Sequence, residues 1–370
     1  MGREKKKKKL SKQQLTLLLL CVVLAALAGA CWLAWWRLSK MLPAQQEAER
    51  WQGDSEMPYK QISCFLPMDE QITLEQIGTF RNDAMSKLKA SSLDITGEET
   101  LMLDCWSTTG KVNVAGNHGK GEASVTAVGG NYFDFHPIRL INGDYLHPDD
   151  LMEDRVLLDE ELSWLLFGGT SLQGLTIKIN GLPYVVAGVI EREQDFASKK
   201  AYTEELGMFM SYEGLRDLNE ELKINCYEYV LANPVKDFAI NIAREKFPIG
   251  RGVIVNNTDR YTVKNLTDIL RQYGSRSTQS TGVLFPYWEN AARITEDWAA
   301  LCCLLGILLP IVPVITAATV TVRALKRGKK KMEERILPEA KEKAEEAVRV
   351  QQRKRWEKKH GESVKSNRYT

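Results

Sequence analysis

The sequence lacks the motifs on which most enzyme active sites are built. It has only four histidines among 370 residues, and no Gly-x-Ser-x-Gly, His-Glu-x-x-His or Cys-x-x-Cys pattern occurs. It also lacks a Gly-x-x-x-x-Gly-Lys-Ser/Thr loop, because the glycines within 116–121 and 168–169 are not followed by Lys-Ser or Lys-Thr. We therefore expect no enzymatic activity, no cofactor and no P-loop binding of ATP by this chain.

Charge is missing from two long stretches. Residues 15–36 and 298–322 contain no Asp, Glu, Lys or Arg. At a rise of about 1.5 Å per residue, each stretch is long enough to cross the roughly 30 Å hydrocarbon core of a bilayer as a helix. Three tryptophans close the first stretch and Trp298 opens the second, as expected for indole rings at a membrane interface. We expect two transmembrane helices at these positions.

The charged residues are divided unevenly among the remaining segments. The formal net charge is +6 over residues 1–14, −13 over 37–297 and +9 over 323–370. Basic residues beside a span stay on the cytoplasmic side, where anionic lipid also attracts them. We therefore expect a plasma-membrane protein with both termini in the cytoplasm, an extracytoplasmic domain at 37–297 and anionic lipid at both basic ends. Because the basic tails adjoin membrane-length runs, nucleic acid is not an expected partner.

The first span has one competing interpretation. Ala28-Gly29-Ala30-Cys31 resembles a lipoprotein cleavage site. However, the apolar run continues to Trp36, beyond the length of a signal-peptide core. A retained membrane helix is the better interpretation.

The second span contains Pro310 and Pro313. Proline removes a helix hydrogen bond and favours a kink. The pair is either a tolerated irregularity, which membrane helices allow, or a hinge. The sequence leaves both possibilities open.

The central segment has the periodicity of an α+β domain. Two β-α-β units are predicted, separated by an insert at about 130–210 that forms a β-rich lobe. The expected strands are 59–66, 100–106, 225–231 and 252–256, and the expected helices are 73–90, 235–247, 263–273 and 287–297. The last of these helices could continue directly into the second span as a stalk.

Two features of the insert have a clear local cause. Asn180-Gly181 lies between two β-prone runs, and Asn-Gly suits the positive-φ turn of a β-hairpin. Asp159 can cap a short helix that runs to residue 166, where Gly168 and Gly169 follow and end it.

The order of motifs over residues 130–190 resembles a known family. A Tyr-Phe segment and a Gly turn are followed by a Leu-Phe-Gly helix end and then by a hairpin that ends in Gly-Val. The same order is found in the extracytoplasmic core domain of MacB-like ABC transporter permeases, the wider FtsX and lipoprotein-releasing group. The matching positions are Tyr132, Phe133, Gly143, Phe167, Gly168, Gly174, Asn180, Gly181, Gly188 and Val189. The resemblance implies a porter-like split β-α-β core with this inserted lobe, anchored above a transport ATPase.

The chain also departs from the family pattern. Family permeases carry three further spans after the domain, whereas one run follows it here. The resemblance therefore implies a half-size permease subunit that works with a separate ABC ATPase and with another permease subunit or a second copy of itself. The alternative is a membrane-anchored accessory or sensor protein that binds an extracellular ligand or envelope partner without transport.

Cysteines and histidines outside the spans are few. Cys64 and Cys105 fall on strands of one predicted β-α-β unit, so either a disulfide between them or free buried thiols is expected. His136 and His147 flank the Gly143 turn, with Asp149 and Asp150 after them. A polar surface loop is the preferred interpretation there, and no metal site is predicted.

The tail at 323–370 is predicted to be a basic helix interrupted at Pro338. Its alternating Glu and Lys residues are typical of a solvated helix. It is either bound to anionic lipid and solvent or a docking helix for an ATPase or another permease.

Overall fold

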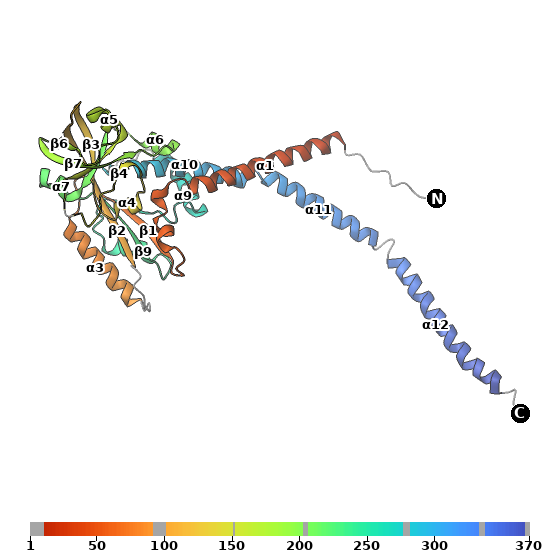
Figure 1. Ribbon diagram of the computed structural model, residues 1–370. Helices are drawn as coiled ribbons and strands as arrows, with labels where there is room; N and C mark the ends of the chain where they lie inside the picture. The colour runs from red at the N-terminus through yellow and green to blue at the C-terminus, as the bar shows by residue number, and fades with distance from the viewer. Residues whose placement is uncertain are drawn as a thin grey trace. The chain divides into compact units, whose positions relative to one another are not determined.

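The computed structural model describes residues 11–91, 101–150, 152–202, 206–276, 282–332 and 337–366. Two compact units are present, one formed by Cys31–Leu305 and the other by Met1–Ala30 with Gly306–Thr370. The first unit contains every strand and is the outer domain (Figure 1). The second contains the larger part of each apolar stretch and the tail.

The outer domain is built on one mixed ten-stranded sheet. Its strand order is β10-β1-β9-β2-β3-β8-β5-β7-β4, and β6 pairs with both β2 and β7. The strands are β1 (Tyr59–Phe65), β2 (Met102–Ala115), β3 (Lys120–Gly130), β4 (Arg139–Gly143), β5 (Arg155–Asp159), β6 (Thr176–Ile179), β7 (Leu182–Glu191), β8 (Gly207–Ser211), β9 (Cys226–Ala232) and β10 (Val253–Asn256).

Helices cover this sheet at several places. The helices of the outer domain are η1 (Pro43–Gln45), α2 (Glu47–Gln52), α3 (Leu74–Ala90), α4 (Tyr132–Phe135), α5 (Glu160–Phe167), α6 (Phe196–Ala201), α7 (Tyr212–Leu218), α8 (Phe238–Lys246) and α9 (Val263–Arg276). Helix α10 (Tyr287–Leu308) begins in this unit, and the helix expected at 287–297 therefore does continue toward the apolar run.

The core end of the sheet matches the two predicted β-α-β units. Strand β9 lies between β1 and β2 and is antiparallel to both. Helix α3 starts with a capping box. The Thr73 side chain accepts a hydrogen bond from the Gln76 backbone N–H, and the Gln76 side chain accepts one from the Thr73 backbone N–H. The strand expected at 100–106 is longer than predicted and continues to Ala115, because β3 pairs along that whole extension.

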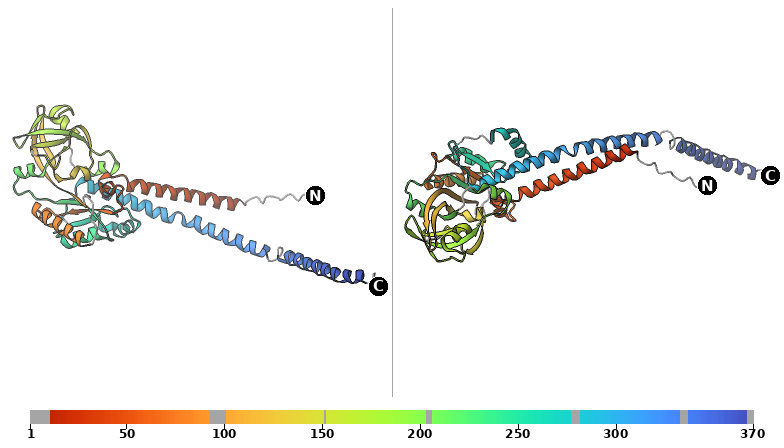
Figure 2. Two further views of the ribbon diagram at one scale, coloured as in Figure 1. Left: turned by 60° about the horizontal axis from the view of Figure 1, so that its bottom comes forward. Right: turned by 90° about the horizontal axis from the view of Figure 1, so that it is seen from above.

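Two hydrophobic clusters divide the outer domain. The first packs α3 and α8 against β1 and β9, with Phe80 in contact with Tyr227 and Tyr229. The second fills the lobe around β5, β7 and β8. Strands β2 and β3 extend through both parts, and Figures 1 and 2 show the lobe and α3 at opposite ends of this pair. The lobe cluster also includes Val112 and Val125, which precede the predicted lobe boundary near 130.

The local features expected in the lobe are confirmed. Asn180 and Gly181 have φ of 48° and 90° and join β6 to β7 as a hairpin. Asp159 accepts a hydrogen bond from the Leu162 backbone at the start of α5, and Gly168 ends the helix in the left-handed conformation.

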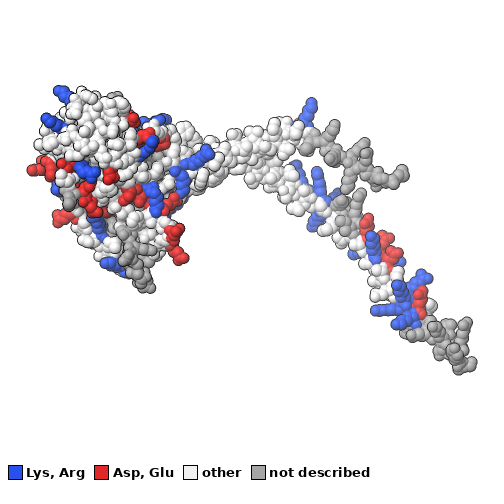
Figure 3. Space-filling model, viewed as in Figure 1, with Lys and Arg blue, Asp and Glu red and all other residues white. Residues whose placement is uncertain are grey.

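The helical unit contains most of both charge-free runs, namely residues 15–30 and 306–322, and the remainder of each run belongs to the first unit. Helix α1 (Lys12–Ser39) carries the first run, and the second is divided between α10 and α11 (Ile311–Lys331). Both regions are long and apolar enough to cross a membrane. The break falls at Pro310, where the helix restarts with Val314 donating to the Pro310 carbonyl. Figure 3 shows the apolar runs free of charged side chains, while both basic and acidic side chains lie along the tail helix α12 (Leu337–Ser366).

The close approach of β4 to β7 gives a testable prediction. Gly143 pairs with Gly188, and a Cβ on Gly188 would lie 2.6 Å from the Asn142 carbonyl oxygen. Replacing Gly188 by Ala should therefore force the two strands apart and destabilise the outer domain by about 1–3 kcal/mol. Thermal or denaturant unfolding measures this change.

Gly169→Ala is the matched control. A Cβ at Gly169 would meet no heavy atom within 4 Å. Its stability should stay within about 0.5 kcal/mol of the parent. Equal losses in both variants would show that the β4–β7 contact is not the cause.

Candidate functional site

The two faces of the core sheet differ in polarity. Because side chains alternate along a strand, Tyr227 and Tyr229 of β9 point to the face covered by α3, and Glu228 points to the other face. Glu228 lies opposite Ser63 of β1 and Cys105 of β2 in the strand register. These three residues form a polar row across the sheet, and all three are buried.

Hydrogen bonds hold the carboxylate of the polar row from both sides. Ser63 Oγ donates to Glu228 Oε1 at 2.5 Å, and Asn257 Nδ2 donates to Ser63 Oγ at 2.6 Å. His136, which follows α4, places Nε2 at 2.6 Å from Glu228 Oε2. The His136 side chain is only 1% exposed and that of Glu228 3%, so the pair is shielded from solvent. Burial raises the pKa of the Cys105 thiol well above its ordinary value.

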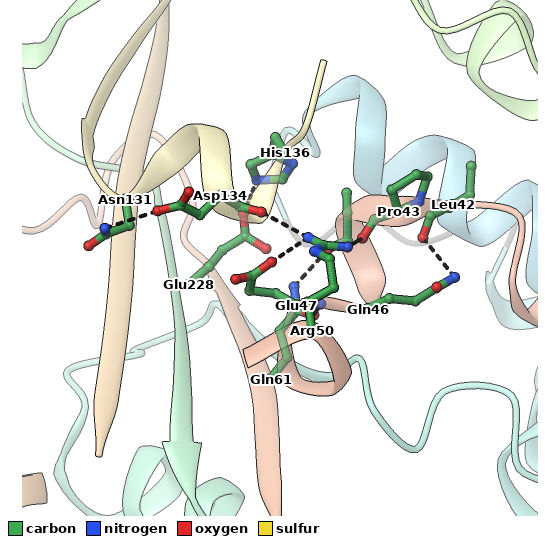
Figure 4. Close-up of polar contacts among 11 residues, drawn as sticks. Leu42, Pro43, Gln46, Glu47, Arg50, Gln61, Asn131, Asp134, His136 and Glu228 are labelled. Carbon is green, nitrogen blue, oxygen red and sulfur yellow. Dashed lines mark hydrogen bonds and ion pairs between the residues drawn. The ribbon is translucent and has the colours of Figure 1, made fainter. Parts of the chain in front are cut away.

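Helix α2 closes the same face beside this pair (Figure 4). Its Arg50 forms an ion pair with Glu47 and donates to the Asp134 carbonyl of α4 at 2.8 Å. The Glu47 backbone N–H donates to Gln61 Oε1 of β1 at 3.0 Å. Burial raises the pKa of the Glu47 carboxyl to about 7, although Arg50 opposes the shift.

The first turn of α10 packs onto this polar face. The Trp288 ring lies 4.6 Å from the His136 ring and 5.8 Å from the Tyr132 ring, measured between centroids. Tyr287 stacks on Tyr202 with centroids 4.2 Å apart. The hydroxyl of Tyr287 also donates to Glu193 at 3.1 Å. Aromatic contacts therefore connect α10 both to α4 and to the segment after β7.

Further along α10, buried charges fix the helix to the segment after β10. Arg260 lies between two carboxylates, with Nη2 at 2.6 Å from Glu289 Oε2 and Nε at 3.1 Å from Glu296 Oε1. Arg293 Nε lies 2.8 Å from Glu289 Oε1. We call Arg260, Glu289, Arg293 and Glu296 the anchor cluster. The Arg260 and Glu289 side chains are only 2% and 3% exposed, so removing either one would leave a buried charge with one partner fewer.

The disulfide alternative for Cys64 and Cys105 is wrong. Both residues are free thiols. Cys64 is opposite Tyr227 and Cys105 is opposite Glu228, which places the two side chains on opposite faces of the sheet. Strand β9 also lies between β1 and β2, so the Cα atoms of Cys64 and Cys105 are roughly 10 Å apart. A disulfide requires Cα atoms within about 7 Å of each other.

The surface-loop prediction holds for one histidine and is wrong for the other. His147 is exposed, with its Nε2 at 3.5 Å from Asp144 Oδ1. His136 is buried, because its ring packs on Trp288 and its Nε2 contacts Glu228. A polar residue next to a proline gave no sequence signal for this burial.

The family-motif positions serve packing and turns. Tyr132 is buried in the core cluster with Phe133 packed against that cluster, whereas Phe167 and Val189 belong to the lobe cluster. The glycines at 143, 168, 174 and 181 all adopt positive φ. The hinge role of Pro310 and Pro313 stays a prediction, although the helix does break at Pro310.

The anchor cluster was missed at the sequence level. Glu289, Arg293 and Glu296 recur at helical spacing, which was a usable signal that one face of the helix is charged. Their partner Arg260 lies in a loop some thirty residues earlier. No local pattern predicts that pairing.

Comparison with known proteins identifies the fold. Residues 102–238 match the family model described as the MacB-like periplasmic core domain, which confirms the resemblance seen at residues 130–190. No curated protein matches the sequence.

Several solved structures are similar to part of the chain. The extracellular domain of the noncanonic ABC-type transporter YknZ from Gram-positive bacteria is 14% identical with a TM-score of 0.36, covering 51% of this chain and 92% of that one. The periplasmic region of MacB from Actinobacillus actinomycetemcomitans is 17% identical with a TM-score of 0.38, covering 55% and 92%. A domain of a putative permease from Porphyromonas gingivalis is 13% identical with a TM-score of 0.29, covering 52% and 87%.

The anchor cluster predicts a large cost for removing one of its charges. Arg260→Met leaves two buried carboxylates without their shared cation, which should destabilise the outer domain by about 3–5 kcal/mol. A double-mutant cycle with Glu289→Gln should show strong coupling between the two positions. Denaturant unfolding of the full chain in detergent measures each corner of the cycle.

Arg271→Met is the control for this cycle. Arg271 pairs with Asp268 at 3.2 Å on the exposed side of α9, with 79% of its side chain accessible. The change in stability should stay within about 0.5 kcal/mol. A comparable loss at both arginines would contradict the role given to the anchor cluster.

Proposed function

We propose, from the MacB-like periplasmic core domain at residues 102–238, that the chain is a non-enzymatic ABC permease-type subunit. It couples the nucleotide cycle of a separate ATPase to movement of its extracytoplasmic domain. Both termini lie in the cytoplasm, and a second permease subunit or a second copy of the chain completes the membrane part. The absence of a P-loop from this sequence fits an ATPase on another chain.

One observation carries this proposal. Helix α10 is continuous from Tyr287 to Leu308, with its first turns fixed inside the outer domain and its last residues within the apolar run. A tilt of the helix would be opposed at its root by the buried charges of the anchor cluster. A packed helix transmits displacement because interiors have low compressibility.

The contacts at the root of α10 suggest where displacement goes. Trp288 touches the His136 and Tyr132 rings, and Tyr132 begins α4 at the entry to the lobe. Tyr287 stacks on Tyr202 next to α6. Movement of α10 would therefore press on α4, which links β3 to β4, and on the segment after α6 inside the lobe. This supports a coupled motion of core and lobe.

The tail is proposed as the docking element for the ATPase. Its helix α12 follows the basic end of α11 and is exposed over the residues whose side chains the structure describes. Anionic lipid could hold the same basic surface by charge alone. Lipid and ATPase would bind the tail in different ways. Attraction to anionic lipid depends on the net charge of the tail, whereas docking to a protein depends on the order of its side chains.

Gentle detergent purification from the native host tests the ATPase partner. The full chain should retain a P-loop ATPase in stoichiometric amount, and a variant without residues 333–370 should lose it. A variant whose tail is scrambled at constant composition is the matched control and should also lose the ATPase while still binding anionic vesicles. Mass spectrometry of the purified complex measures retention.

One result would contradict the coupling role, and another would contradict the docking role of the tail. One is a full chain that retains neither an ATPase nor another permease, which would favour the ligand-binding accessory protein instead. The other is equal ATPase retention by the full chain and the tail-scrambled variant, which would assign the tail to lipid and not to docking.

Orientation has its own test. Reporters that fluoresce only in the cytoplasm should be active when fused to either terminus, because both ends of the chain are basic. A reporter placed at the Asn180-Gly181 turn should be silent. Activity at the turn, or at only one terminus, would refute the proposed orientation.

A further inference from the structure

Three side chains with metal-binding atoms meet at the centre of the polar face. The Cys105 thiol, the His136 ring and the Glu228 carboxylate each offer one ligand atom, and these atoms lie within 4.8 Å of one another. All three residues are at most 2% exposed. They come from β2, from the segment after α4 and from β9, so folding of the outer domain brings them together.

We propose that Cys105, His136 and Glu228 bind a divalent cation of the zinc class. Zinc takes Cys, His and Glu ligands at about 2.0–2.3 Å, which places ligand atoms of a tetrahedral site roughly 3.3–3.8 Å apart. Side-chain shifts of about an ångström would reach that geometry from the present one. Thiolate and imidazole ligands disfavour magnesium and calcium, which select oxygen.

Charge favours occupancy of such a buried site. A thiolate and a carboxylate together carry two negative charges, and a neutral imidazole adds none. One divalent cation therefore gives a neutral group, the arrangement that costs least where water is excluded. Binding would displace the Cys105 proton and break the direct His136–Glu228 contact of 2.6 Å.

The groups behind the three ligands have the arrangement of an outer coordination sphere. Ser63 Oγ, which itself accepts from Asn257, donates to Glu228 Oε1 and leaves Oε2 directed at the other ligands. Such partners orient a ligating carboxylate. Among the described residues, His136 Nδ1 and Tyr132 Oη are buried without a hydrogen-bond partner, so protein contacts alone do not satisfy this pocket.

A cavity is lined by residues next to the site, although the three ligands themselves do not line it. It measures about 350 Å³, and Ser107, Cys226 and Trp288 are among the residues that line it. Cys226 lies on the same face of β9 as Glu228, two residues before it. Occupancy would tie α4 to β2 and β9 directly beneath Trp288, and so stiffen the joint between α10 and the lobe. The binding test below is independent of any ATPase partner.

Metal analysis of the full chain tests the proposal. The untagged or histidine-free-tagged protein, loaded with Zn²⁺ in detergent and then desalted, should retain one zinc per chain by elemental analysis. Cobalt in place of zinc should give a thiolate-to-metal charge-transfer band and the visible bands of tetrahedral Co²⁺. Magnesium should neither bind nor compete.

Two matched variants locate the site. Cys105→Ser should abolish the charge-transfer band and weaken zinc affinity by more than about tenfold. Loss of an outer-sphere partner alone already weakens metal affinity by about that factor. Cys64→Ser is the control, because Cys64 is a buried thiol on the opposite face of the same sheet. Likewise His136→Asn should lose zinc, and His147→Asn should keep it.

The proposal can be overturned by measurements on the native protein alone, so the test does not depend on whether a variant folds. A native chain that retains no zinc and gives no charge-transfer band with cobalt excludes the site. Equal zinc retention by native protein, Cys105→Ser and His136→Asn also excludes it, because the bound metal would then lie elsewhere. Zinc that raises the melting temperature of native protein and of Cys64→Ser, but not of Cys105→Ser, supports it.

Discussion

A carboxylate in the middle strand of the core sheet is the constraint on which the outer domain depends. Glu228 is buried between β1 and β2, where an uncompensated charge would cost several kcal/mol, on the order of 3–5. Ser63 and His136 contact it directly and Asn257 holds Ser63, so three separate parts of the chain contribute. Those three contacts in turn fix β1, the segment after β10 and α4. The polar face therefore specifies one arrangement of these elements, which an apolar face would leave freer.

Helix α10 is positioned by that same face. Trp288 lies on His136, and the anchor cluster holds the next turns of the helix through Arg260. The aromatic rings supply buried contact area at the first turn of α10, and the buried ion pairs fix the direction and the rotation of the helix. A membrane helix attached in this way can only move together with the sheet behind it. This is the physical content of the coupling role proposed for the chain.

Much of the fold was predictable because its signals are local. The Thr73 capping box, the Asn180-Gly181 hairpin and the Asp159 cap each depend on residues within a few positions of one another. The candidate site was not, since its partners are far apart: Ser63 and Glu228 are separated by 165 residues. Cys64 and Cys105 show where prediction from the sequence stops. The strands that carry them were predicted well. Whether the two thiols can form a disulfide depends on the sheet face of each side chain and on the strand order, and both follow from the register with β9.

The strand order has a consequence for synthesis. Strand β1 leaves the ribosome early, but its neighbours in the sheet are β9 and β10, which emerge only after the whole lobe. Until then both edges of β1 are unpaired. Such distant pairing is slow and exposes unpaired strand edges. The strands of the lobe are nearer to one another in sequence, so the lobe can fold first. The core sheet is then the last part of the outer domain to form.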